Sequence, residues 1–110
     1  MNFEALLVPK SHPALIGKTS VVGMLSKNFI PAGQVIEACV LRKIEPPAPG
    51  SAVEAHTLFN GKDYFLVLGH FYNYRRAENS TYVNANVTMD ENLAYVTAGK
   101  DLIQGEEIFL

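Results

Sequence analysis

Two segments near the opposite ends of this 110-residue chain repeat one pattern, and this repeat constrains the fold more than any other feature. Residues 26–36 and 98–108 each begin with a small residue, carry an aliphatic residue four positions later and a glycine three positions after that. These glycines, Gly33 and Gly105, can adopt a positive φ in a tight turn that precedes a new apolar strand. The repeat predicts two similar strand–turn–strand units that bring distant parts of the chain together. Chance similarity of two turn segments is the alternative interpretation.

The rest of the sequence predicts further short strands and one helix. Ser51 followed three residues later by Glu54 is a capping box, and it predicts a helix of two to three turns that ends before Gly61. The proline-rich residues 46–50 must form a loop, because proline can neither donate to a strand ladder nor continue a helix. Apolar or alternating runs predict strands at residues 3–8, 21–26, 35–41 and 64–68 and a hairpin over residues 82–97.

Composition describes an ordinary globular chain. With 48% hydrophobic and 18% charged residues, the length predicts a single domain over residues 1–110. No apolar run approaches the ~20 residues of a membrane span, and the N-terminal sequence has no signal-peptide pattern. We therefore expect a cytoplasmic protein without a membrane partner, with nuclear or virus-associated locations left open.

Charge and cysteine content narrow the classes of partner. The net charge of −2 gives no general attraction to nucleic acid, so we expect no nucleic-acid partner. The single Cys39 excludes an internal disulfide and a zinc site made of several thiolates, and we expect no metal. Cys39 ends an apolar run, which favours a buried small side chain over a nucleophile.

Three motifs stand in order along the chain. The central one is Gly-His-Phe-Tyr-Asn-Tyr at residues 69–74, followed by Glu-Asn at residues 78–79; the late one is Asp-Leu-Ile-Gln-Gly-Glu-Glu-Ile at residues 101–108. The early one is Val-Val-Gly at residues 21–23. Together they resemble the SET domain family of protein-lysine methyltransferases. That family has a Gly-x-Gly turn, a central Arg-Phe-x-Asn-His followed by Pro-Asn, and a late Asp-[Ile/Leu]-x-x-Gly-Glu-Glu-[Leu/Ile]. The resemblance covers residues 20–110 and keeps the spacing of short single-domain viral and bacterial SET proteins.

The resemblance implies a fold and an activity. The fold is mostly β, a SET-like β-clip with several short strands, one short helix and a pseudoknot-like C-terminal crossing. In that crossing residues 71–79 lie beside residues 106–110. The implied activity is S-adenosylmethionine-dependent N-methylation of lysine in a protein partner that presents a lysine-bearing segment. Whether the chain also forms a homo-oligomer is left open.

Carried over residue by residue, the resemblance implies where the cofactor would bind. Gly23 and its neighbours Val22 and Met24 would face the methionyl part of S-adenosylmethionine. Asn73 would hydrogen-bond the cofactor. Tyr74 would occupy the place of the family's histidine, which contributes backbone contacts.

The family also aims the substrate lysine through a narrow channel lined by tyrosines. Phe71 and Tyr72 would line the floor of the site. The family places one channel tyrosine in its helical segment, where Thr57 is the nearest match, and another about two residues beyond Leu110. Tyr72 and Tyr82 are therefore our candidate catalytic residues, and Tyr64 is a further tyrosine that could substitute in space.

Three departures from the family motifs weaken the enzymatic interpretation. Val21 stands where the first glycine belongs, Tyr74 replaces histidine and Glu78 replaces proline. The sequence therefore predicts a SET-like protein with a degenerate or incomplete lysine channel. The alternative is a non-enzymatic β-clip module for binding or assembly. A third interpretation, a β-clip unit of the antifreeze-like or hydrolase-associated kind, explains the repeated turn but not Asn73 to Asn79.

Other charged residues have structural interpretations. His70 is expected to be a satisfied structural histidine, and the pair Arg75-Arg76 a solvated loop rather than a contact for phosphate or an acidic partner. Neighbouring residues of a strand point to opposite faces, so Glu106 and Glu107 cannot easily share a proton. One of them is expected in solvent and the other beside a donor.

Overall fold

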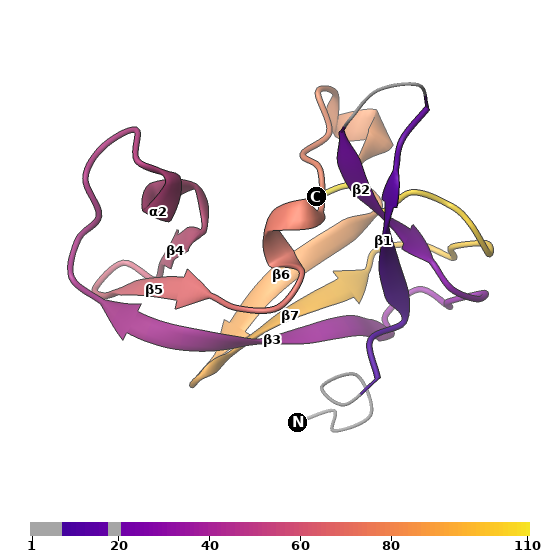
Figure 1. Ribbon diagram of the computed structural model, residues 1–110. Coiled ribbons are helices and arrows are strands. Elements are labelled where there is room, and N and C mark those ends of the chain that lie inside the picture. The colour runs from indigo at the N-terminus through magenta and orange to yellow at the C-terminus, as the bar shows by residue number, and fades with distance from the viewer. Residues whose placement is uncertain (1–7, 18–20) are drawn as a thin grey trace.

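The computed structural model describes residues 8–17 and 21–110, and nearly all of its regular structure is β (Figure 1). β1 (Ser11–Leu15) and β2 (Val22–Ser26) form a two-stranded antiparallel sheet. The second sheet has five strands in the order β4-β5-β3-β7-β6 and is antiparallel throughout. Its strands are β3 (Val35–Ile44), β4 (Thr57–Phe59), β5 (Tyr64–Val67), β6 (Ala85–Asp90) and β7 (Leu93–Ala98).

Within residues 8–17 and 21–110, helical structure is limited to three short pieces. These are α2 (Ala52–Ala55) and the 3₁₀ turns η1 (Phe71–Asn73) and η2 (Ser80–Tyr82). No helix in the described part of the chain is long and apolar enough to cross a membrane. The strand predicted at residues 3–8 lies outside the described residues except for Val8, which lies in a bend.

The repeated segments form the two matching units that the sequence predicts. Gly33 and Gly105 both have positive φ, 88° and 82°, and each sits in a turn closed by a hydrogen bond from the following residue. The units also hold each other, because Gly33 N donates to Ala98 O while Gly105 N donates to Ser26 O, both at 2.8 Å. These two bonds become equivalent when one repeat is laid on the other. The prediction of corresponding turns is confirmed.

An isolated antiparallel bridge, Ile30 to Leu102, lies between these turns and joins the two units through two backbone bonds of 2.9 and 2.8 Å. Both side chains are almost completely buried. The apolar residue four positions into each repeat is therefore a core residue. The largest fully buried side chains come mainly from the two units and the strands beside them: Met24, Ile30, Ile36, Val96, Leu102 and Ile108.

The C-terminal segment crosses beside the central motif. Arg75 and Phe109 form a parallel bridge, Leu110 N donates to Arg75 O, and Ala77 N donates to Leu110 O. The side chain of the buried Asn84 binds the same segment through two hydrogen bonds: its amide nitrogen donates to Glu107 O, and its amide oxygen accepts from Phe109 N. The predicted pseudoknot-like crossing is confirmed, and Figure 1 shows the C-terminus beside η1.

The predicted helix begins correctly and ends too late. Ser51 caps α2 by accepting from Glu54 N, as the capping box predicts. The helix then stops at Ala55, and β4 follows where the helix was expected to continue toward Gly61. The reason is a hairpin, because β4 pairs with β5 across a turn in which Gly61 has φ 94°. Gly61 is therefore a hairpin residue and not the end of a helix.

Candidate functional site

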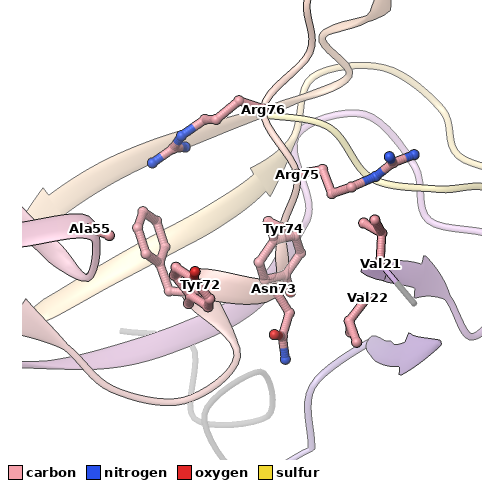
Figure 2. Close-up of a pocket in the computed structure, with 9 residues that line it drawn as sticks. Val21, Val22, Ala55, Tyr72, Asn73, Tyr74, Arg75 and Arg76 are labelled. Atoms are coloured by element: carbon pink, nitrogen blue, oxygen red, sulfur yellow. The ribbon is translucent and has the colours of Figure 1, made fainter. Parts of the chain in front are cut away.

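A cavity of about 620 Å³ opens between the start of β2 and η1 (Figure 2). One wall is formed by Val21 and Val22, the other by residues 71–76, and Ala55 of α2 closes one side. This volume lies within the range of about 300–1,000 Å³ that is typical of small-molecule sites. The early and central motifs of the sequence therefore meet across one concave site.

Asn73 supplies a free amide to this cavity. It is the last residue of η1, and its backbone N–H is occupied by His70 O at 2.9 Å. The side chain is half-buried and makes no hydrogen bond to any other described residue. Both the amide oxygen and the amide nitrogen can therefore bind a ligand.

Beneath the cavity, Tyr74 is anchored in a buried polar network. Its ring is 3% exposed, its hydroxyl donates to Glu37 Oε1 at 2.7 Å, and it lies 2.6 Å from Ser11 Oγ. Burial first, and then the charge of Glu37, raise the pKa of Tyr74 well above its ordinary value. The phenol therefore stays protonated and fixes the end of η1 from below.

Glu37 is the centre of this network. The carboxylate is 3% exposed, and its Oε2 accepts from His70 N at 3.0 Å. The buried His70 Nδ1 lies 3.4 Å from the same oxygen without a hydrogen-bond geometry. Cys39 lies nearby, and burial followed by the charge of Glu37 raises the pKa of its thiol far above the ordinary value. Cys39 is thus buried, as the sequence predicts, and its raised pKa keeps the thiol protonated.

Arg75 is held by Glu107. Nε donates to Oε2 at 2.6 Å, and the terminal nitrogen donates to Oε1 at 2.7 Å, which is a bidentate pair. The hydrogen bonds that Arg75 donates to Glu107 raise the pKa of its guanidinium above the ordinary value. The interpretation of Arg75 as a solvated loop residue is therefore wrong, because the crossing C-terminal segment places a carboxylate against it. Glu106 instead accepts from Ile103 N within its own turn, so the two glutamates do have separate partners.

The position of the Glu107 carboxylate also explains why residue 23 is glycine. A Cβ at this position would lie 2.5 Å from Glu107 Oε2 and 2.9 Å from Ile16 Cγ1, closer than real Cβ contacts come. The residue must therefore be glycine for the Arg75–Glu107 pair to lie where it does. This requirement comes from packing within the chain and involves no ligand.

Arg76 differs from its neighbour. It is exposed, its guanidinium carbon lies 5.3 Å from the centroid of the Phe71 ring, and no described carboxylate forms an ion pair with it. Figure 2 shows the two guanidinium groups turned in opposite directions, Arg75 toward Val21 and Arg76 toward the side of Ala55. Arg76 therefore brings an uncompensated positive charge to the cavity.

The structure gathers some of the predicted site residues and separates others. Val22, Tyr72, Asn73 and Tyr74 line the cavity together. Gly23 is buried against Glu107 and Ile16, and the side chain of its neighbour Met24 is completely buried in the core.

The two candidate tyrosines lie apart. Tyr72 lines the main cavity and stacks on His56, with ring centroids 3.9 Å apart and an interplanar angle of 12°. Tyr82 is 65% exposed and lines a second cavity of about 350 Å³ with Glu78 and Phe109. Arg75 and Arg76 border both cavities and so lie between the two tyrosines.

Sequence reasoning missed two features of the site. Glu37 gave no signal, because a single glutamate in an apolar run resembles a strand residue at a solvent-facing position. Arg76 gave a weak signal, since an arginine three residues after Asn73 falls within reach of the same turn. The central motif could have indicated Arg76 as a site residue. The contact between Glu37 and Tyr74, in contrast, is seen only in the folded structure.

Comparison with known proteins identifies the fold. No protein-family model and no curated protein sequence matches the chain. Among 34 matching chains of solved structures is a crystal structure of a candidate histone methyltransferase from Plasmodium falciparum. The match has a TM-score of 0.69 at 20% sequence identity and covers 92% of this chain and 90% of that one. At this identity the likeness shows the fold alone. The chain therefore has a small SET-like β fold, shared with this candidate histone methyltransferase.

Proposed function

We propose that this chain binds S-adenosylmethionine in the cavity between β2 and η1 and acts as a protein-lysine N-methyltransferase. The observation that carries this proposal is the convergence of Val22, Asn73 and Tyr74 on one cavity within a SET-like fold. The motifs that resemble the family's cofactor site are 50 residues apart in sequence, yet they form opposite walls.

The residues of the cavity fit such a cofactor. Its volume suits a drug-sized molecule. The free amide of Asn73 offers a donor and an acceptor for the polar end of the ligand. The exposed ring of Tyr72 offers an aromatic face, which attracts cationic groups such as a sulfonium.

Methyl transfer to an amine makes few chemical demands on a protein. Bound S-adenosylmethionine would supply the methyl group on a sulfonium electrophile, so no strong acid is required. What the chain must provide is position: an in-line approach of the lysine amine and exclusion of water. The anchored η1 turn, fixed by Tyr74 to Glu37 and Ser11, provides a rigid wall for this purpose.

A non-enzymatic β-clip module is the second candidate, and one observation favours it. Gly23 is required by the Arg75–Glu107 pair, and Met24 by the core. These two features of the early motif would therefore persist in a protein that had lost its cofactor. Binding and transfer must be measured separately.

Calorimetric titration with S-adenosylmethionine and with S-adenosylhomocysteine tests cofactor binding. We expect saturable binding and a rise in melting temperature, because a ligand that binds only the native state stabilises it. Asn73→Ala should weaken binding by about 1–3 kcal/mol if the amide is buried by the ligand. Asn86→Ala is the matched control, since Asn86 is exposed on β6 and does not line the cavity. No heat and no thermal shift at millimolar ligand would favour the non-enzymatic module.

Transfer of a labelled methyl group to lysine-rich proteins tests activity. Tyr72→Phe and Tyr82→Phe keep the rings and remove the hydroxyls. If one tyrosine lines the lysine channel, its variant should lose transfer while the affinity for S-adenosylhomocysteine stays unchanged. Loss in neither variant would exclude both as channel residues.

A further inference from the structure

Arg75 and Arg76 stand side by side at the cavity, and the structure gives them different states. Arg75 makes two short hydrogen bonds to Glu107, with donor–acceptor distances of 2.6 and 2.7 Å. Its charge is therefore matched within the fold. Arg76 has no such partner among the described residues, and its side chain lies over the buried ring of Phe71.

This placement leaves the hydrogen-bonding edge of Arg76 free. The guanidinium carbon lies 5.3 Å from the centre of the Phe71 ring, and a guanidinium whose N–H donors are unpaired can match a carboxylate with two parallel hydrogen bonds. Phe71 is 3% exposed and belongs to η1, so the ring that supports Arg76 is fixed. The arginine is thus held at the cavity while its donors remain unpaired.

The acidic groups near the two arginines lie outside the lining of the main cavity. Glu37 lies beneath Tyr74 with both oxygens hydrogen-bonded, and Glu78 lines the second cavity rather than the main one. Glu107 is matched by Arg75. An anion that enters the main cavity therefore meets Arg76 without a competing carboxylate among the described residues that line it.

We propose that Arg76 binds the α-carboxylate of the amino-acid end of the cofactor, so that the cavity selects S-adenosylmethionine and its demethylated product over adenine nucleosides that lack a carboxylate. The inference rests on the proposed function, because it assigns a residue to that same site. It makes Arg76 a specificity-determining residue, although the sequence motif does not contain it.

Paired titrations test this assignment. S-adenosylhomocysteine carries the carboxylate, and 5′-methylthioadenosine keeps the nucleoside and the sulfur but lacks the amino-acid end. We expect Arg76→Met to lower the affinity for S-adenosylhomocysteine about tenfold or more. The affinity for 5′-methylthioadenosine should stay within about twofold. Methionine retains an aliphatic contact with Phe71, so folding is preserved, and the melting temperature of each variant checks this.

Two further variants sharpen the result. Arg76→Lys keeps the charge but loses the planar pair of donors, so it should recover only part of the preference for S-adenosylhomocysteine. Arg42→Met is the matched control, because Arg42 is an exposed arginine on β3 that lines neither cavity. The preference of the wild type should also weaken as salt rises, and that of Arg76→Met should not.

The outcomes separate the two proposals. If the wild type binds neither ligand, the proposed function and this inference both fail. If the wild type binds S-adenosylhomocysteine and Arg76→Met binds it equally well, the inference alone fails. Unchanged cofactor binding together with weaker binding of an acidic peptide would likewise overturn it, because Arg76 would then serve the second cavity.

Discussion

Gly23→Ala gives the sharpest test of how the site is built. The added Cβ would lie 2.5 Å from Glu107 Oε2 and 2.9 Å from Ile16 Cγ1. The carboxylate cannot simply move away, because Arg75 holds both of its oxygens. Overpacking costs about 1–3 kcal/mol, and a weakened, partly exposed ion pair adds about 1 kcal/mol. Alanine in a strand recovers about 0.5–1 kcal/mol relative to glycine.

We therefore expect Gly23→Ala to lower the free energy of unfolding by about 2 kcal/mol. In urea this corresponds to a midpoint lower by about 1–2 M. Unfolding is followed without any cofactor, so that the measurement reports only packing within the chain.

A double-mutant cycle identifies the contact. Glu107→Ala removes the carboxylate, and Gly23→Ala in that background should cost about 1 kcal/mol less than in the wild type. Gly105→Ala is the control, since a Cβ there meets nothing within 4 Å. Gly105→Ala should lower the free energy of unfolding by the same amount in the wild type and in the Glu107→Ala background. If Gly23→Ala costs the same in both backgrounds within about 0.5 kcal/mol, the contact with Glu107 is not the reason for glycine.

Three further outcomes follow from the fold and the buried network. Gly33→Ala and Gly105→Ala should each cost about 1 kcal/mol, equal within about 0.5 kcal/mol, because both residues have positive φ and open space; unequal midpoints in urea would contradict the symmetry of the turns. Tyr74 has a raised pKa, so the unfolded chain releases this proton above about pH 10 while the folded chain keeps it, and stability falls as the pH rises. At pH 8 Tyr74→Phe should be less stable than the wild type by about 1–2 kcal/mol, because Glu37 loses a hydrogen-bond donor. This difference in the free energy of unfolding should become smaller by pH 11. A difference that stays constant would contradict the predicted dependence of stability on the pKa of Tyr74. Cys39 should resist a thiol reagent at pH 8 until urea unfolds the chain, because its thiol is buried and its pKa is raised; rapid native labelling would show an exposed thiol.

Local chemistry explains why much of the fold could be predicted from sequence. The turn glycines and apolar spacing of the repeats specify strands and turns directly, so Gly33, Gly105, Ile30 and Leu102 lie where the pattern indicates. The end of the helix could not be read in the same way. Ser51 signals the start locally, whereas the stop depends on pairing with β5.

The site was predictable only in outline. The motifs indicated that Val22 and Asn73 would meet, and they do line one cavity. A motif does not say where a side chain points, and Met24 turns into the core. The contacts of Glu37 and Glu107 join segments more than 30 residues apart, so no local pattern reveals them. Cofactor use, catalysis by Tyr72 or Tyr82, and the likeness to short viral and bacterial proteins stay predictions.

The backbone hydrogen bonds that join the two repeats have a consequence for synthesis on the ribosome. The strand at Met24 pairs with Ile108, and the turn at Ala32 is tied to Asp101, 69 residues later in the chain. Long closures of this kind slow folding, because their entropy must be lost before the contacts form. During synthesis β1 and β2 can therefore pair with each other early, whereas the backbone at Met24 and Ala32 stays without its partners until the second repeat has left the exit tunnel.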